Sequence, residues 1–157
     1  MGSNPTSTAT PHELQPDAAA MTAITASVDV AVSADRAWAA ITDWVGQGSW
    51  MPLTTVEVES GDGALGTRLL ARTGVGPAAI VDPMTVDVWE PPLRCEVQHH
   101  GKVVRGRGIF TVESIGPERS RVTWTEVVDG ALARATASLT RLGLLVALRR
   151  FAKRLVS

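Results

Sequence analysis

Cysteine, tyrosine and phenylalanine are scarce in this sequence of 157 residues, which has one Cys, no Tyr and two Phe. The single cysteine, Cys95, excludes an internal disulfide, and no group of Cys and His residues has the spacing of a zinc site. No uninterrupted apolar run of about 18 residues predicts a transmembrane helix. The N-terminus also lacks the basic and then apolar order of a signal peptide. We therefore expect a cytoplasmic protein without a metal ion.

Charge is nearly balanced, and the formal net charge of −1 gives no general attraction to nucleic acid. A chain with 45% hydrophobic and 20% charged residues is typical of a soluble globular protein, and its length suits one domain. The charge is unevenly distributed, because residues 130–157 contain no acid. The cations in that stretch are Arg134, Arg141, Arg149, Arg150, Lys153 and Arg154.

Residues 1–20 are rich in Pro, Ser, Thr and Ala and show no hydrophobic periodicity. Such a composition buries too little apolar surface to offset the loss of chain entropy, so we predict a disordered leader. A single domain is then expected over residues 21–157.

The first half of this domain predicts a strand, a helical segment and two further strands. Alternation of apolar and polar residues predicts the first strand over residues 22–30. Ser33 has the chemistry of a helix N-cap, and the apolar spacing after it predicts a short helix to about Asp43, then one more helical turn. Turn sequences rich in glycine separate strands expected over residues 54–59 and 67–73.

Residues 81–128 contain four runs that alternate at period two. Turn signals at residues 91–92, 101–102 and 116–117 separate the runs and predict an antiparallel meander, which brings the total to seven strands. Registering the runs on these turns predicts which residues lie opposite each other. The expected pairs are Met84 with His99, Val86 with Val97, Val88 with Cys95, Val97 with Gly106, Cys95 with Gly108, Gly108 with Glu126, and Phe110 with Trp124.

These pairs keep one parity, so the meander is expected to have a single apolar face that needs a cover. After Gly130 the apolar period becomes helical and remains so to the C-terminus. This pattern predicts a helix of about 25 residues, roughly 37 Å long, that crosses the sheet. The stripe expected to face the sheet comprises Leu132, Ala135, Leu139, Leu142 and Val146.

Three ionisable residues, Asp82, His99 and Glu126, share the apolar face of the predicted sheet. Burying a carboxylate or an imidazole is costly unless the group is paired or neutralised. Gly106 and Gly108 on the same face leave volume unfilled. These features predict a hollow with a few polar groups between the sheet and the helix. The alternative is that the glycines bend the strand and the acids lie at the wet ends of the sheet.

Asp82 and His99 are expected on adjacent strands, within side-chain reach. In one interpretation the carboxylate orients the imidazole and raises its pKa, for acid-base catalysis of enolisation, aldol closure or dehydration. In the other the two form a structural hydrogen bond. Glu126 either contacts a ligand or binds an Arg or a backbone amide at the rim. No glycine-rich motif joins a strand to a helix, which excludes a dinucleotide site, and we expect no cofactor.

Several segments resemble those of the START-like helix-grip (SRPBCC) superfamily, and within it the bacterial polyketide cyclase/dehydrase-type proteins. They are SADRAWAAITDW after the first strand, LGTR opening the third, DPMTVDVWEPPLRCEV, GxGxF at residues 106–110, and Trp-Thr-Glu in the last strand. The similarity spans residues 21–155. It implies an α+β fold, in which a curved seven-stranded antiparallel sheet wraps around a long C-terminal helix, with two short helices between the first two strands.

The resemblance also implies an apolar cavity that binds a lipid, sterol, polyketide or similar hydrophobic molecule, and only some of these proteins are enzymes. Three hypotheses stay open: ligand binding, a cyclase or dehydratase reaction using His99 with Asp82, and contact of the basic helix end with an anionic membrane or a protein partner. The sequence leaves the ligand and the oligomeric state open. The expected cavity residues are Trp38, Trp50, Met84, Val86, Cys95, Val97, Gly106, Gly108, Phe110, Trp124, Glu126, Leu139, Leu142 and Val146.

Overall fold

The computed structural model describes residues 21–157, so the leader predicted over residues 1–20 lies outside the described part of the chain. This part of the chain contains seven strands, two α-helices and two short 3-10 helices. In chain order the elements are β1 (Met21–Val30), α1 (Ala34–Ile41), η2 (Val45–Ser49), β2 (Thr54–Ser60), β3 (Arg68–Thr73), η3 (Gly76–Ala78), β4 (Ile80–Glu90), β5 (Arg94–His100), β6 (Arg105–Gly116), β7 (Arg119–Asp129) and α2 (Ala131–Leu155).

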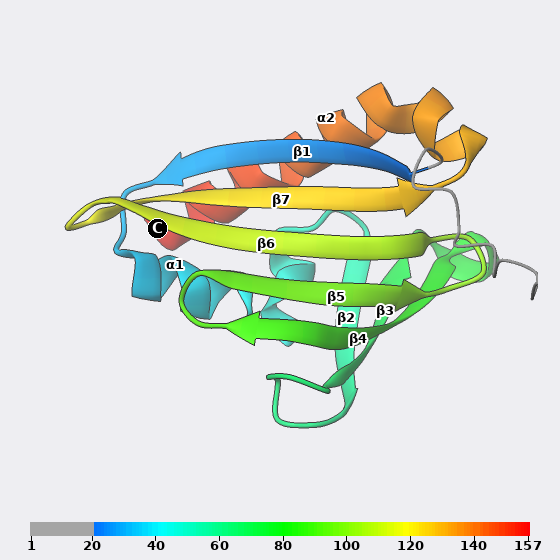
Figure 1. Cartoon of the computed structure of the whole chain (residues 1–157), viewed down its shortest axis with the longest axis horizontal. Helices are drawn as coiled ribbons and strands as arrows, with labels where there is room; N and C mark the ends of the chain where they lie inside the picture. The colour runs from blue at the N-terminus through cyan, green and yellow to red at the C-terminus, as the bar shows by residue number, and fades with distance from the viewer. Residues whose placement is uncertain (1–20) are drawn as a thin grey trace, which may run out of the picture.

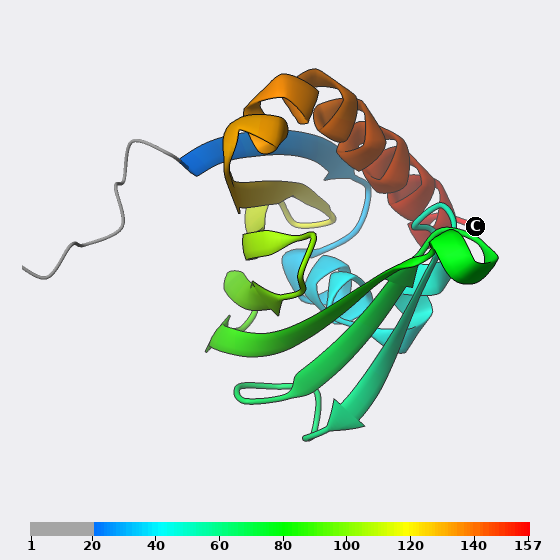
Figure 2. The ribbon, with the colours of Figure 1, turned by 90° about the vertical axis from the view of Figure 1, so that its right-hand side faces the viewer.

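One antiparallel sheet contains seven strands, in the order β1-β7-β6-β5-β4-β3-β2. Strands β2 to β7 therefore follow one another as a meander, and β1 pairs with β7 at the far edge (Figure 1). The sheet curves, and α2 crosses its open side, as Figure 2 shows. This arrangement confirms the predicted α+β helix-grip fold, with α1 and η2 as the two short helices between β1 and β2.

The predicted register is confirmed between β6 and β7 and over part of β4 and β5. In both places a short turn fixes the pairing, and alternate side chains then fall on the predicted face. The confirmed pairs are Met84 with His99, Val86 with Val97, Gly108 with Glu126, and Phe110 with Trp124.

The register at the other end of β4 and β5 differs from the prediction. An irregularity after Val86 leaves Val88 opposite Glu96 and places Trp89 opposite Cys95. A bulge of this kind adds a residue to one strand and exchanges the faces of the residues beyond it. Trp89, in place of Val88, therefore turns to the inner side of the sheet.

The register between β5 and β6 is also displaced from the prediction. Val97, expected opposite Gly106, lies opposite Gly108, and Cys95, expected opposite Gly108, lies opposite Phe110. The cause is the connection between the strands, which is longer than the expected two-residue turn. Because the displacement is an even number of residues, each side chain keeps its predicted face.

Buried aromatic side chains lie where α1, η2 and the C-terminal half of α2 meet. The hydroxyl of Ser33 caps α1 by accepting from the backbone N–H of Arg36 at 3.4 Å, as predicted. Trp38 on the inner side of α1 is buried. Trp50 follows η2 and packs against Phe151 of α2, with ring centroids 5.3 Å apart. The contact between Trp50 and Phe151 therefore joins the residue after η2 to α2 at this end.

Helix α2 has the predicted length but presents a different face to the sheet. Leu139, Leu142 and Val146 were expected to point inward, yet they are 72%, 56% and 40% exposed. The N-terminal half instead turns a face of small and short polar residues toward the sheet. The members of this small face are Ala133, Thr136, Thr140, Gly143 and Ala147.

Candidate ligand-binding cavity

A cavity of about 630 Å³ lies between the concave face of the sheet and the N-terminal half of α2. Period-two alternation turns every second side chain of the sheet inward, and most of those at the cavity are apolar. The sheet contributes Val56, Ala71, Met84, Val97, Phe110, Trp124 and Val128. The small face of α2 forms the opposite wall, together with Leu132 and Leu144. Short side chains on the helix therefore leave open the space that larger ones would fill.

A polar cluster interrupts the apolar wall, and it consists of Asp82 on β4, His99 on β5 and Glu126 on β7. His99 Nδ1 lies 2.6 Å from Asp82 Oδ2, and His99 Nε2 lies 3.2 Å from Glu126 Oε2. The indole N–H of Trp124 donates to Glu126 Oε1 at 2.6 Å. The structure thus brings Asp82 and His99 together, as the sequence predicts, and adds Glu126 as a third member.

The protonation state of His99 determines the net charge of this cluster. Burial of His99 opposes its positive charge, but the hydrogen bonds and negative charges of Asp82 and Glu126 outweigh burial and raise the pKa of His99 to about 10. An imidazolium carries a proton on each ring nitrogen, so it can donate to both carboxylates at once. At neutral pH His99 is therefore a buried cation that links two acids.

The description "polyketide cyclase / dehydrase and lipid transport" belongs to the family that matches residues 21–157 of the chain. The chain belongs to this family. No curated protein sequence matches it significantly.

Solved structures similar to this family member share its fold at low sequence identity. The Zhui aromatase/cyclase from Streptomyces sp. R1128 is 19% identical, with a TM-score of 0.68, and the match covers 87% of this chain and 96% of that chain. A START superfamily protein from Mycobacterium smegmatis is 17% identical, with a TM-score of 0.70 and coverage of 85% and 98%. A norcoclaurine synthase from Thalictrum flavum is 18% identical, with a TM-score of 0.63 and coverage of 87% and 94%. These likenesses confirm the START-like fold.

The absence of a side chain at Gly108 provides space mainly for the polar cluster and less for the cavity. A Cβ atom at Gly108 would lie 3.1 Å from Val97 Cγ2, 3.2 Å from Glu126 Oε1 and 3.4 Å from His99 Nε2. Such a contact is tight on three sides, two of them within the polar cluster. The missing side chain therefore makes room for His99 to reach Glu126 across β6, although Gly108 also lines the cavity.

Gly106, expected at the cavity, has a purely structural role. Its φ of +131° lies in a region that favours glycine, and a Cβ there would be 1.9 Å from the backbone oxygen of Val127. The missing side chain permits close approach of β6 and β7. Gly106 therefore leaves no volume for a ligand.

Several other residues expected at the cavity lie elsewhere in the structure. Four are packed into the core beyond it, because the aromatic cluster fills that end of the molecule: Trp38, Trp50, Val86 and Cys95. Burial raises the pKa of the Cys95 thiol to about 12, which fits a small hydrophobe and not a nucleophile. Three more lie on the exposed side of α2: Leu139, Leu142 and Val146. The predicted residues that do line the cavity are Asp82, Met84, Val97, His99, Gly108, Phe110, Trp124 and Glu126.

The small face of α2 is the part of the site that the sequence analysis missed. Thr136, Thr140, Gly143 and Ala147 repeat at helical spacing, and such a run of short side chains is the signal that would have indicated a hollow beneath the helix. Within residues 21–157, no group of three or more His, Cys, Asp or Glu residues is placed to hold a metal ion.

Proposed function

We propose that this protein binds a small hydrophobic molecule, such as a lipid, a sterol or a polyketide-like compound, in the cavity between the sheet and α2. The observation that carries the proposal is the cavity of about 630 Å³, walled by Met84, Phe110 and Trp124. Pockets for small molecules typically enclose about 300–1,000 Å³ and are mostly apolar with a few polar groups. Membership of a family of cyclases, dehydrases and lipid transporters supports the same conclusion.

Filling the cavity from the helix should weaken binding. Gly143 lines the cavity, and a Cβ atom placed there would meet nothing within 4 Å. The substitution Gly143→Leu therefore extends a side chain into the space that a ligand would occupy. We expect the affinity for Nile red, a neutral apolar dye, to fall about tenfold or more, since overpacking costs about 1–3 kcal/mol. Fluorescence titration of the dye measures this change.

A matched control adds the same side chain to the other side of the helix. Ser138 is exposed, so Ser138→Leu should leave the affinity for Nile red unchanged. If Gly143→Leu folds and still binds the dye as tightly as the unsubstituted protein does, the dye does not occupy this cavity and the proposal is wrong.

Catalysis by His99 with Asp82 is the alternative that the sequence raises. The two side chains face one cavity and lie 2.6 Å apart, as a catalytic pair would require. A general base, however, needs a free ring nitrogen near neutral pH. Both ring nitrogens of His99 contact carboxylates, and its pKa is raised to about 10. The geometry therefore favours a charged binding wall over a proton-transfer site.

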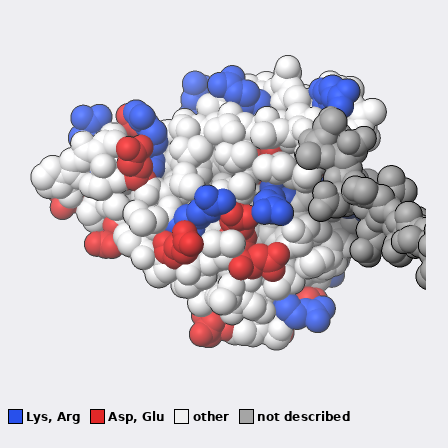
Figure 3. Space-filling model, in the orientation of Figure 1, with Lys and Arg blue, Asp and Glu red and all other residues white. Residues whose placement is uncertain are grey.

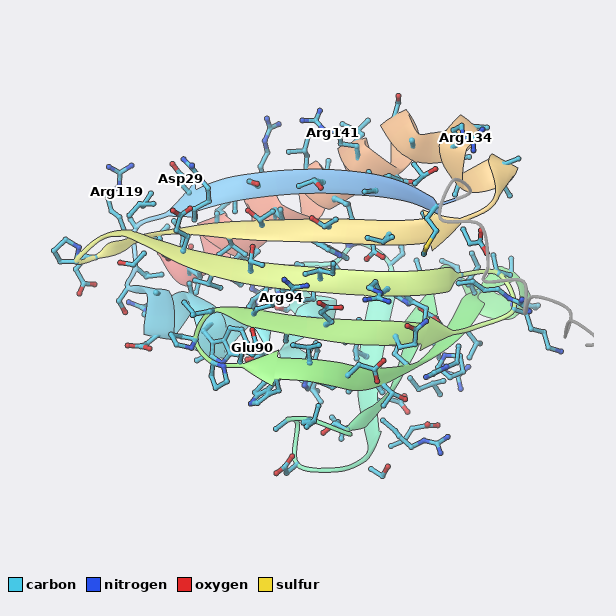
Figure 4. All side chains as sticks on the ribbon, viewed as in Figure 1. Asp29, Glu90, Arg94, Arg119, Arg134 and Arg141 are labelled. Carbon is cyan, nitrogen blue, oxygen red and sulfur yellow. The ribbon has the colours of Figure 1, made fainter. Side chains whose placement is uncertain are left out.

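A second candidate function is attachment to an anionic membrane surface, and the outer side of α2 favours it. Leu139, Leu142 and Val146 form an exposed apolar stripe there. Figure 3 shows Lys and Arg gathered along the upper edge of the molecule over α2, and Figure 4 labels Arg134 and Arg141 on this helix. Apolar residues beside cations, with no acid in the helix, are typical of helices that lie on anionic lipid.

The length of α2 adds weak support for a membrane role. By length and composition it could cross a membrane, but core helices of soluble proteins pass the same test. Here Leu148 and Phe151 anchor the helix in the core, and its N-terminal half covers the cavity. We therefore propose contact with a membrane surface and not a span.

Removing two cations from the end of α2 should weaken vesicle binding. Arg149 and Arg150 are exposed, and each cation near an anionic surface contributes about 1 kcal/mol. We expect the double variant Arg149→Gln with Arg150→Gln to bind phosphatidylglycerol vesicles about 30-fold less tightly at low salt, measured by co-sedimentation. The control double variant Arg72→Gln with Arg119→Gln removes the same charge from the sheet. Equal losses in both, or binding that does not respond to salt, would contradict this role.

A further inference from the structure

The buried part of the cavity wall carries an excess of negative charge. Asp82, His99 and Glu126 together contribute two carboxylates and one imidazolium, which leaves one net negative charge. Among the described residues that line the cavity, the other charged side chains are Arg105 and Asp129. Both of these are exposed, and their charges offset each other. The excess therefore belongs to the buried cluster.

One oxygen of the cluster has no hydrogen-bond partner. Glu126 accepts at both oxygens, from His99 and from the indole of Trp124. Asp82 accepts at Oδ2 only, and its Oδ1 is the buried side-chain polar atom that lacks a partner among residues 21–157. Asp82 is only 8% exposed. A buried carboxylate oxygen without a donor is costly, and a donor that reaches it recovers this cost.

Asp82 Oδ1 lies near the end of the cavity that is formed by the loop between β5 and β6. Asp82 Oδ1 lies 3.0 Å from the place where a Cβ of Gly101 would be, so it lies beside the loop that joins β5 to β6. Val103 and Val104 of the same loop line the cavity. Asp82 itself lines it too. A ligand whose polar end is directed at this loop would therefore lie against the Asp82 side chain, although Oδ1 itself is covered beside Gly101.

We infer that the ligand is an apolar molecule with a protonated amine, whose N–H donates to Asp82 while its apolar body lies against Phe110 and Trp124. This inference rests on the proposed binding function and adds the class of ligand. An ammonium group supplies both a hydrogen-bond donor for Asp82 and a positive charge that offsets the excess on the wall. A neutral hydroxyl supplies only the donor. A carboxylate supplies neither and is repelled by the cluster.

Three ligands with one alkyl chain and different head groups test this inference. Dodecylamine, dodecanol and dodecanoate compete with Nile red near neutral pH and below their micelle concentrations. We expect dodecylamine to bind more tightly than dodecanol by about tenfold or more, the effect of a hydrogen bond to a charged group, and dodecanoate to bind most weakly. In Asp82→Asn, which keeps the shape of the side chain, the preference for the amine should disappear. The exposed acid Asp87, which does not line the cavity, serves as control, since Asp87→Asn should keep the preference.

The possible outcomes distinguish failure of the amine inference from failure of the proposed hydrophobic binding. Equal affinities for amine and alcohol, tighter binding of dodecanoate, or an amine preference that survives in Asp82→Asn would overturn the inference and leave hydrophobic binding in place. Failure of all three ligands and of Nile red to bind would overturn both. If Asp82→Asn does not fold, Glu126→Gln removes the same charge from the wall, and the amine preference must fall there too.

Discussion

Unfolding of this protein is expected to become easier as the pH rises from 6.5 to about 10, with the free energy of unfolding falling by up to about 1.4 kcal/mol per pH unit. Asp82 and Glu126 hold the pKa of His99 above its ordinary value of 6.5, at about 10 in the folded chain. The folded protein therefore keeps a proton that the unfolded chain releases. This stabilisation is complete below pH 6.5 and is lost as the pH passes the folded pKa. Urea titrations at several pH values, followed by tryptophan fluorescence, measure it.

Two histidine variants isolate the source of this pH dependence. His99→Gln removes the titrating imidazole, so the fall between pH 6.5 and about 9 should vanish; above pH 9.0 the Cys95 thiol, whose pKa is raised to about 12, adds a fall of its own. The substitution also leaves Asp82 and Glu126 without their cation, and we expect a loss of about 3–5 kcal/mol near neutral pH. His100 is exposed and lies 3.0 Å from Thr85 Oγ1, so His100→Gln should behave like the unsubstituted protein. The same pH dependence in His99→Gln would show that another group causes it.

The substitution Gly106→Ala is expected to destabilise the fold by about 3 kcal/mol or more, because it combines a φ that alanine rarely adopts with a steric clash. The clash is with the backbone of β7, since the new Cβ would be 1.9 Å from the oxygen of Val127. A backbone atom cannot turn aside as a flexible side chain can. Relief therefore requires a shift of the β6–β7 ladder. Thermal and urea unfolding of the variant measure the loss.

Gly143→Ala is the matched control for this prediction. It makes the same chemical change in the middle of α2, where a Cβ meets nothing within 4 Å. Alanine has the higher helix propensity, so a gain of about 1 kcal/mol is expected. If Gly106→Ala unfolds at the same urea concentration as the unsubstituted protein, the close approach of β6 and β7 is not important to the fold.

The faces of the sheet strands could be predicted from the sequence because a period of two tolerates some errors of register. Val97 pairs with Gly108 and not with the expected Gly106, yet its side chain still points inward. An odd displacement, as at the bulge after Val86, has the opposite effect and brings Trp89 inward. Turn sequences do not indicate such a bulge, because it lies within β4 and away from the turn that follows the strand.

The displaced register between β5 and β6 explains why Glu126 was not predicted as a partner of His99. In the expected register Gly108 lies opposite Cys95, which separates Glu126 from the imidazole. In the structure Gly108 lies opposite both Val97 and Glu126. Because Gly108 has no side chain, His99 and Glu126 reach across β6 and come within 3.2 Å of each other. A pairing error that preserves faces can therefore still hide a contact between neighbouring strands.

The orientation of α2 could not be predicted from hydrophobic periodicity alone. Its bulky stripe through Leu139 and Leu142 is the more apolar one, and burial normally selects such a stripe. Here the helix spans two environments: its C-terminal half packs into the core through Leu148 and Phe151, and the direction of that packing determines which side of the N-terminal half faces the sheet. The N-terminal half thus follows contacts made more than two turns away.

If the cavity binds a ligand as proposed, its two walls should determine different properties of that ligand. The short side chains at Thr136, Thr140 and Gly143 should limit its size, whereas Asp82 and its neighbours on the sheet should select its charge. The two sets lie on separate elements and share no hydrogen bond within residues 21–157, so substitutions in them should act nearly independently. Substitutions in α2 during evolution could therefore change the size of the ligand that fits, while the head group that the sheet binds stays the same. Variants substituted only in α2 should differ in the size of the ligand that they bind and not in their preference for its charge.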